Sequence, residues 1–324
     1  MMKKFIKLFF IFVIPIVVSS YFIDVFISNH LKKSNKDAFG EYTTWNDLLE
    51  GKVNSDIVIY GSSRAWRHFS PQIITDRLHL SAYNLGMDGH NFWLQYLRHT
   101  TLIKNNTKPK LIICSLDVFT LQKNKDLYNS EQFLPYMLGN KDIEYATKSY
   151  NGFNWFDYKI PLVRYYGKYF EIIKTAYLSI NPSANKIKRV RGYQRKDELW
   201  NSDFDRAKLK MKKYEIQLDS KTLVLFETFL KECKANNIKL VFVYTPEYIE
   251  GQKFVKNRGQ IMGLYKKFSR DYQIPFYDYS NDSISYQKKY FYNATHLNKY
   301  GSELFTKKIT DTLKESAILK KLNH

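Results

Sequence analysis

Hydrophobic and polar positions divide much of the chain into short apolar runs that alternate with longer amphipathic segments. The apolar runs predict strands at Asp56–Tyr60, Ala82–Leu85, Leu111–Leu116, Leu240–Tyr244 and Pro275–Tyr279. The segments between and after them predict helices from Ser70-Pro71 to Leu78, at Asn91–Lys104, across 257–270, and from Asn298 onward. Strands that alternate with helices predict βαβ units and a mostly parallel sheet covered on both faces.

Apolar spacing also indicates which side chains form the core. Phe226, Phe229, Leu230 and Cys233 follow an i, i+3, i+4, i+7 pattern, which places them on one face of a helix. The second cysteine, Cys114, lies within a predicted buried strand. We therefore expect both cysteines to be core residues rather than partners in a disulfide.

Residues 121–219 interrupt this alternation. The segment is rich in Tyr, Phe and Lys and contains the basic clusters "NKIKRVRGYQRK" and "RAKLKMKK". We expect a mainly helical insertion within an α/β domain that covers residues 54–324. A polar linker is expected at residues 31–53.

The N-terminus predicts export. Lysines at positions 3, 4 and 7 precede an apolar stretch from Leu8 to Ile23, which Asp24 interrupts before Val25-Phe26-Ile27. A helix that crosses a bilayer needs ~20 mostly apolar residues, and preceding lysines favour a cytoplasmic N-terminus. Residues 1–30 are therefore expected to be a retained signal-anchor. A signal peptide cleaved near Val17-Val18-Ser19-Ser20 is the alternative. Either places the following domain outside the cytoplasm, in a periplasm or at the cell surface.

Charge narrows the classes of partner. The chain has 324 residues, and 51 Lys and Arg against 31 Asp and Glu give a net charge of +20. This excess favours nucleic acid, anionic lipid headgroups or an acidic polymer. Export argues against nucleic acid, because a DNA-binding protein requires residues 54–324 in the cytoplasm. Protease accessibility on intact cells distinguishes an exported domain from a cytoplasmic DNA-binding protein. The sequence shows no metal-ligand spacing, and we expect no metal and no cofactor.

Three polar blocks stand at the ends of predicted elements. "GSS" at 61–63 follows the first strand, "YNLGMDGHN" at 83–91 includes and follows the second, and "FYNATHLNKYGSELF" at 291–305 precedes and enters the last helix. In parallel α/β sheets, sites lie beyond the carboxyl ends of the strands. The three blocks are therefore expected to meet at one edge of the sheet.

Together these blocks resemble the SGNH/GDSL hydrolase superfamily, whose first block has the form Gly-x-Ser. The resemblance implies a three-layer α/β/α flavodoxin-like fold and an esterase or O-acyl enzyme. Ser63 would be the nucleophile, and His296 would be the general base that a serine requires. The backbone N–H groups of Ser63 and Gly89 would form the oxyanion hole.

Two positions depart from the superfamily pattern. Asn293 stands three residues before the histidine, where the family has aspartate; it could orient the imidazole but carries no charge. Asp117 follows the third strand, where the family has the asparagine of its "GxND" block. Both departures occur in a membrane-anchored branch that the chain resembles more closely, with one N-terminal span, a "GSSR" or "GSSE" block and a "HLN…G" block. That branch includes envelope polysaccharide acyltransferases and esterases, and proteins that assist teichoic-acid D-alanylation.

Several of these residues also have structural interpretations. Ser63 could cap the following helix, although Ser62 is the expected cap, and Gly89 could serve only a turn. Asn84 could bind the glycine-rich loop or substrate. Asp117 could contact substrate or tie down a loop. Arg64 could bind an acidic sugar or phosphate, or pair with Asp117 or Asp88. His68 and His90 lie near the expected site loops.

Two functions remain open from the sequence. The first is an anchored ester hydrolase or O-acyltransferase that acts on an acylated or acidic envelope polysaccharide through an acyl-Ser63 intermediate. The second is a catalytically inactive protein of the same fold that binds glycan or assists a membrane O-acyltransferase. Membrane lipid around the N-terminal helix is an expected partner of both.

Overall fold

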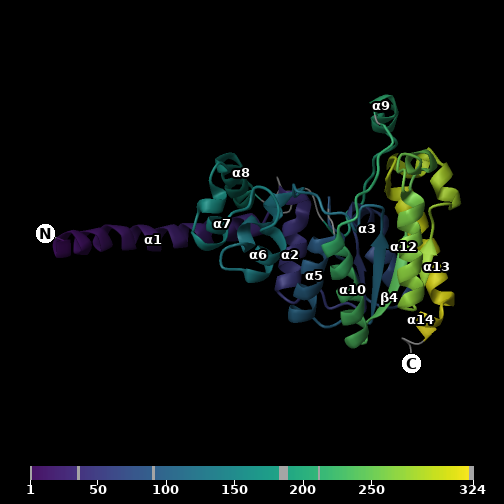
Figure 1. The fold of residues 1–324 in the computed structure, drawn as a ribbon, viewed down its shortest axis with the longest axis horizontal. Coiled ribbons are helices and arrows are strands. Elements are labelled where there is room, and N and C mark those ends of the chain that lie inside the picture. The colour runs from purple at the N-terminus through teal and green to yellow at the C-terminus, as the bar shows by residue number, and fades with distance from the viewer. Residues whose placement is uncertain (1, 35–36, 90–91, 182–188, 211, 321–324) are drawn as a thin grey trace. The chain divides into compact units, whose positions relative to one another are not determined.

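A computed structural model describes residues 2–34, 37–89, 92–181, 189–210 and 212–320 of the chain (Figure 1). The described chain divides into two compact units. Unit 1 comprises residues 1–46 and 125–188, and unit 2 comprises residues 47–124 and 189–324. The strand-helix alternation of the sequence falls in unit 2.

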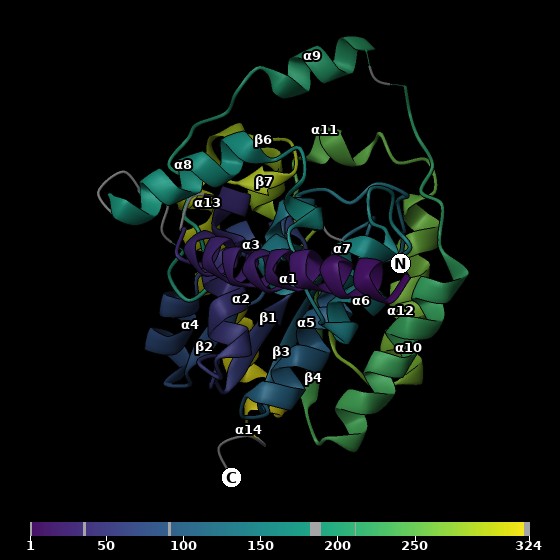
Figure 2. The same ribbon diagram turned by 90° about the vertical axis from the view of Figure 1, so that its left-hand side faces the viewer.

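Unit 2 is built on a five-stranded parallel sheet with the order β2-β1-β3-β4-β5. Its strands are β1 (Ile57–Tyr60), β2 (Ala82–Asn84), β3 (Leu111–Leu116), β4 (Lys239–Tyr244) and β5 (Phe276–Asp278). Figure 2 shows the first four side by side. This is the flavodoxin-like order, and its switch point lies between β1 and β3. The expected fold class, α/β with a mostly parallel sheet, is confirmed.

Helices cover both faces of this sheet. Ile57, Ile59 and Val241 pack in one apolar cluster with Phe305 and Ile309 of α13. On the opposite face, the rings of Tyr60 and Phe242 lie against Phe229 and Phe226 of α10. One face is thus covered by α3 (Ser63–His68), α4 (Pro71–Leu78), α13 (Lys299–Glu315) and α14 (Ala317–Lys320), and the other by α5 (Phe92–Asn105), α10 (Ser220–Ala235) and α12 (Arg258–Asp271). The result is the expected three-layer arrangement.

Smaller elements complete unit 2. β6 (Phe291–Asn293) and β7 (His296–Leu297) form a two-stranded antiparallel ribbon that the hydrophobic pattern did not predict. The remaining elements are α9 (Asp203–Lys210), α11 (Ile249–Gln252), η5 (Ser283–Tyr286) and η6 (Lys288–Tyr290). Cys114 and Cys233 are both buried and unpaired, which confirms their interpretation as core residues.

Unit 1 is helical within its described residues. It contains α1 (Met2–Lys32), η1 (Asp37–Gly40), most of α2 (Glu41–Leu49), η2 (Ser130–Tyr136), α6 (Lys141–Thr147), α7 (Trp155–Lys159), η3 (Val163–Tyr165) and α8 (Tyr169–Ile180). Trp45 is buried against Phe133, and its indole N–H donates to Gln132 at 3.0 Å. The expected linker at 31–53 is therefore mostly helical and partly in a core. The expected insertion is divided as well, because residues 189–219 group with unit 2.

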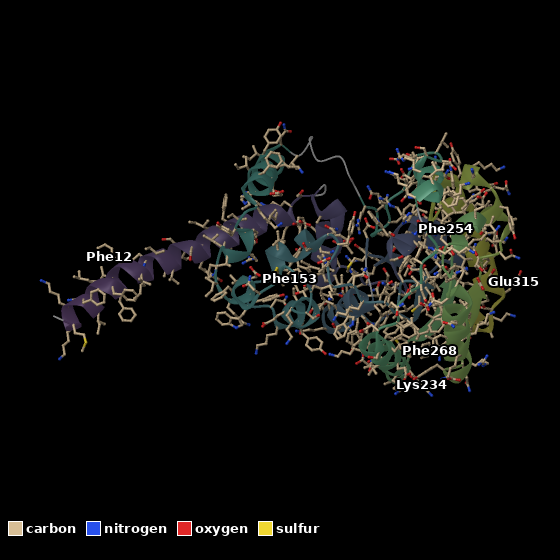
Figure 3. All side chains as sticks on the ribbon, turned by 45° about the horizontal axis from the view of Figure 1, so that its top comes forward. Phe12, Phe153, Lys234, Phe254, Phe268 and Glu315 are labelled. Atoms are coloured by element: carbon tan, nitrogen blue, oxygen red, sulfur yellow. The ribbon has the colours of Figure 1, made fainter. Side chains whose placement is uncertain are left out.

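The helix α1 is long and apolar enough to cross a membrane. Its apolar side chains are mostly exposed, including Phe12, which Figure 3 labels on the part of the helix that carries few neighbours. Near its C-terminal end, Asp24 accepts two hydrogen bonds from the guanidinium of Arg164, at 2.6 and 2.7 Å. Both side chains are buried, so this ion pair neutralises the one acidic residue of the helix.

Candidate functional site: a serine–histidine pair at the end of the first strand

Strand β1 ends in a turn that requires glycine. Gly61 has φ +147°, and a Cβ at this position would lie 2.6 Å from the backbone oxygen of Ser115 on the neighbouring strand. The chain then turns into α3, where Ser62 is the N-cap and its hydroxyl accepts from the backbone N–H of Arg64 at 3.2 Å. Ser62 is thus the capping residue, as expected, and Ser63 is the first residue of the helix.

Ser63 meets His296 at this edge of the sheet. The hydroxyl Oγ of Ser63 lies 2.8 Å from Nε2 of His296, although the two residues are 233 positions apart in the sequence. His296 is held on β7, in the ribbon that precedes α13. The distance lies within the 2.6–3.2 Å range in which a base can take a proton from a serine.

The other imidazole nitrogen faces Asn293. Nδ1 of His296 lies 3.0 Å from the side-chain oxygen of Asn293 and 3.0 Å from the hydroxyl of Thr295. The same Asn293 oxygen accepts from the backbone N–H groups of Thr295 and His296, at 3.1 and 3.0 Å. An Nδ1–H that donates to Asn293 is the tautomer in which Nε2 is free to accept the serine proton.

The surroundings of His296 favour its neutral form. Burial is the largest cause, and the charges of Arg67 and Arg64 add to it, so that the pKa of His296 falls to about 3. The ring of Tyr292 stacks on the imidazole at a centroid distance of 5.4 Å and an interplanar angle of 9°. At neutral pH the imidazole is therefore available as a proton acceptor and fixed in orientation.

His68 joins the two elements that carry this pair. Its Nε2 accepts from the backbone N–H of Leu297 on β7 at 2.9 Å, and its Nδ1 donates to the hydroxyl of Thr245 at 2.8 Å. Burial, followed by the charge of Arg64, lowers its pKa well below the ordinary value. The residue is fully buried within α3, so the structure gives it a positioning role between α3, β4 and β7 rather than a place facing the site. His90, the other histidine expected near the site, lies outside the described residues.

Arg64 pairs with a residue that sequence analysis did not single out. Its guanidinium lies 3.3 Å from the carboxylate of Glu247, and its Nε donates to the hydroxyl of Thr245 at 3.1 Å. Glu247 also accepts from the hydroxyl of Tyr244 at 2.8 Å and pairs with Arg258 at 3.4 Å. The expected ion-pair partners, Asp117 and Asp88, are thus replaced by Glu247. Its position after β4, at the same sheet edge, is the signal that could have identified it.

A cavity of about 250 Å³ opens beside the serine–histidine pair. Its lining includes Ser63, Gly89, Thr295, His296, Arg64, Asp117, Phe119 and Glu247. Gly89 has φ +58° and is exposed at the rim. Asp117 is buried, and one of its carboxylate oxygens accepts from the backbone N–H of Phe119 at 2.8 Å, so it ties down the loop after β3 while facing the cavity.

Asn84 serves the loops around the site rather than the cavity. Its amide donates to the backbone oxygens of Ala65 and Phe69, at 2.8 and 2.9 Å, and its oxygen accepts from the N–H of Gly86 at 2.9 Å. The side chain is fully buried, which excludes the direct substrate contact considered from the sequence. Among the described residues, no group of three or more His, Cys, Asp or Glu side chains is placed to hold a metal ion.

The chain matches no protein-family model and no curated protein sequence. Similar solved structures include a protein described as a lipolytic member of the G-D-S-L family from Desulfitobacterium hafniense DCB-2. The two sequences are 10% identical, the match covers 79% of this chain and 98% of the other, and the TM-score is 0.40. A protein described as an acylhydrolase from Bacteroides fragilis is 14% identical, with 84% and 95% covered and a TM-score of 0.37. A GDSL-like lipase from Bacteroides thetaiotaomicron is 13% identical, with 84% and 96% covered and a TM-score of 0.37. Because identities are this low and TM-scores lie below 0.5, the assignment of the fold rests on the chain's own strand order and helix layers.

Proposed function

We propose that unit 2 is a serine-dependent ester hydrolase or O-acyltransferase with Ser63 as nucleophile and His296 as general base. The observation that supports this most directly is the 2.8 Å contact between Ser63 Oγ and His296 Nε2, beside a cavity at the carboxyl end of β1. With its pKa lowered, His296 is neutral at pH 7, the protonation state in which an imidazole can accept the serine proton.

The proposed reaction has two halves. Ser63 Oγ attacks the acyl carbonyl while its proton passes to His296 Nε2, and the backbone N–H groups of Ser63 and Gly89 donate to the resulting oxyanion. The ester C–O bond then breaks, and His296 returns the proton to the departing alcohol. In the second half a water or a sugar hydroxyl attacks the acyl-serine while its proton passes to His296. The bond between the acyl carbon and Ser63 Oγ then breaks, His296 returns the proton to Ser63, and the acyl group leaves as a carboxylic acid or as the new sugar ester. Water as acceptor makes the enzyme an esterase, and a sugar hydroxyl makes it a transferase.

An envelope polysaccharide is the proposed substrate class. The apolar helix α1 and the net charge of +20 favour a surface-bound enzyme near an acidic polymer. The lysines at positions 3, 4 and 7 favour a cytoplasmic N-terminus, and with α1 as a single span the proposal is that unit 2 lies outside the cytoplasm. Protease digestion of intact cells tests this placement: cleavage within unit 2 from outside is expected, and full protection until lysis contradicts it.

Covalent labelling with a fluorophosphonate tests the chemistry. The full chain in detergent is compared with Ser63→Ala, His296→Ala and the matched control Ser62→Ala. We expect label on the wild type and on Ser62→Ala, whose missing hydroxyl caps α3 at the cavity edge but does not contact His296, and none on the other two. Wild type without label, or label that persists in Ser63→Ala, contradicts an activated Ser63.

The alternative function is a non-catalytic glycan-binding or accessory protein, and Asn293 is the observation that favours it. An amide supplies no negative charge to stabilise the imidazolium that forms during the reaction. This alternative predicts folded but unlabelled protein, glycan binding that Ser63→Ala leaves unchanged, and co-purification with a membrane O-acyltransferase. Hydrolysis of 4-nitrophenyl acetate that depends on Ser63 excludes it.

A further inference from the structure

Helix α8 presents an apolar face to solvent within unit 1. Phe170, Ile173, Tyr177 and Ile180 follow an i, i+3, i+7, i+10 spacing, and their side chains are 59–82% exposed. Thr175 and Leu178 on the other side of the helix are buried. A surface helix of a water-soluble domain has the reverse pattern, with polar side chains outward. The outward apolar face therefore calls for an apolar environment.

This face begins where the apolar part of α1 ends. The backbone N–H of Leu162 donates to Asp24 at 2.7 Å, Arg164 pairs with Asp24, and the hydroxyl of Tyr165 lies 2.8 Å from that of Ser28. These contacts fix the turn before α8 to the position on α1 that directly follows the apolar stretch Leu8–Ile23. α8 also packs against α1, and Figure 1 shows α7 and α8 around the C-terminal end of that helix.

Further aromatic side chains of unit 1 are exposed on the elements that precede α8. Trp155 and Phe156 of α7 and Tyr166 before α8 are all more than half exposed. Trp and Tyr gather at the boundary between hydrocarbon and water, where an apolar ring with a polar edge is best solvated. An isolated exposed apolar residue needs no explanation, but several on one face of a helix mark an interaction surface.

We propose that α7 and α8 lie in the headgroup region of the bilayer that α1 crosses, with Phe170, Ile173 and Tyr177 inserted among the lipids. Unit 1 is then a membrane module made of one crossing helix and one interfacial helix, tied together by the buried Asp24–Arg164 pair. Lipid is favoured over a protein partner because α8 packs against α1, the helix long and apolar enough to cross a membrane, whose own apolar side chains are exposed. The inference is independent of the chemistry proposed for unit 2.

Depth-dependent fluorescence quenching tests this placement. The full chain, in a Cys114→Ala/Cys233→Ala background, is reconstituted into vesicles of phosphatidylethanolamine and phosphatidylglycerol. Single cysteines at Phe170, Ile173 or Tyr177 carry an environment-sensitive fluorophore. Glu171→Cys, on the same helix outside the apolar face, and Val224→Cys, exposed on α10 of unit 2, are the controls.

We expect labels at 170, 173 and 177 to be quenched by lipids that carry a nitroxide near the headgroup, and to be at least threefold less sensitive to aqueous iodide than the label at 224. Among the four labelled positions of α8, the label at 171 should be quenched most strongly by iodide. Iodide quenching at 173 and 177 equal to that at 224 overturns the proposal, because the face is then in water. Protection from both quenchers also overturns it, because the face is then covered by protein.

Discussion

The side-chain oxygen of Asn293 lies 3.0 Å from Nδ1 of His296, and the Nε2 atom of the same ring lies 2.8 Å from the hydroxyl of Ser63. The three side chains thus form a connected chain of hydrogen bonds without a carboxylate at its end. Asn293 fixes the orientation of the imidazole, but a charge formed on the ring in the proposed proton transfer would meet an amide oxygen and the hydroxyl of Thr295 rather than a carboxylate.

Asn293→Asp should therefore increase the Ser63-dependent rate, provided that unit 2 is catalytic. A carboxylate stabilises the imidazolium directly, and the reverse change in a serine protease lowers turnover by ~10⁴. We expect a gain of at least about tenfold in kcat on 4-nitrophenyl acetate. Asn293→Ala, which removes the orienting contact, should lower kcat by about 10- to 100-fold, the value of one hydrogen bond to a group that becomes charged. An unchanged rate in both variants shows that Asn293 does not act through His296.

The pH dependence of labelling should extend further into acid than an ordinary histidine allows. His296 must be neutral to accept a proton, and its pKa is lowered to about 3 by burial, by Arg67 and by Arg64. The rate of fluorophosphonate labelling should stay nearly level from pH 8 to about pH 5 and fall only below that. An unperturbed histidine would already give half of the rate at about pH 6.5.

Arg67→Gln is the matched variant for this profile. The positive charge of Arg67 is the second cause of the lowered pKa of His296, so its removal should raise that pKa. The fall in labelling rate at acid pH should then begin at a higher pH, while the rate at pH 8 changes little. Circular dichroism at each pH checks that the protein is still folded. A half-maximal rate near pH 6.5 in the wild type contradicts the neutral, desolvated imidazole.

Replacement of Arg64 should destabilise unit 2 strongly. Arg64→Met leaves the buried carboxylate of Glu247 without one of its two arginine partners, and loss of one member of a buried pair costs about 3–5 kcal/mol. Lys208→Met, which breaks the exposed contact with Glu250, should change the free energy of unfolding by less than about 1 kcal/mol. Urea denaturation followed by circular dichroism measures both, and equal effects would contradict a structural role for Arg64.

The glycine before the two serines gives a backbone test. In Gly61→Ala the new Cβ would lie 2.6 Å from the backbone oxygen of Ser115 in a φ region that other residues rarely adopt. We expect a loss of at least about 2 kcal/mol in unfolding free energy and a reduced labelling rate. Gly263→Ala is the control, because the α12 position has open space around it and alanine favours a helix by roughly 0.5–1 kcal/mol. A Gly61→Ala variant as stable as the wild type would show that the turn tolerates a side chain.

The sheet was predictable because its signals are local and repeated. Each strand of the five-stranded sheet was predicted from an apolar run, and no observed bound differs from the predicted one by more than one residue. Since parallel strands end at one edge, Ser63 and Gly89 could be expected to share that edge. The histidine followed from its block before α13.

The remaining contacts depend on residues far apart in the sequence. Glu247 pairs with Arg64 across 183 positions, and no local pattern distinguishes a buried glutamate from an exposed one. The Asp24–Arg164 pair joins the N-terminal helix to a segment that looked like an insertion of the α/β domain. Helix α2 was a different kind of omission. Tyr42, Trp45 and Leu49 show helical spacing within the expected linker. The polar composition of that segment led to the prediction of a linker instead of a helix.

The 233 positions between Ser63 and His296 also have a consequence in time. Chains are synthesised at about 5–20 residues per second, so Ser63 emerges on the order of ten to fifty seconds before His296. Until β7 and α13 dock, the serine has only the weak reactivity of a free hydroxyl. The growing polypeptide is therefore chemically silent toward cellular esters, and the proposed activity begins only with the completed fold of unit 2.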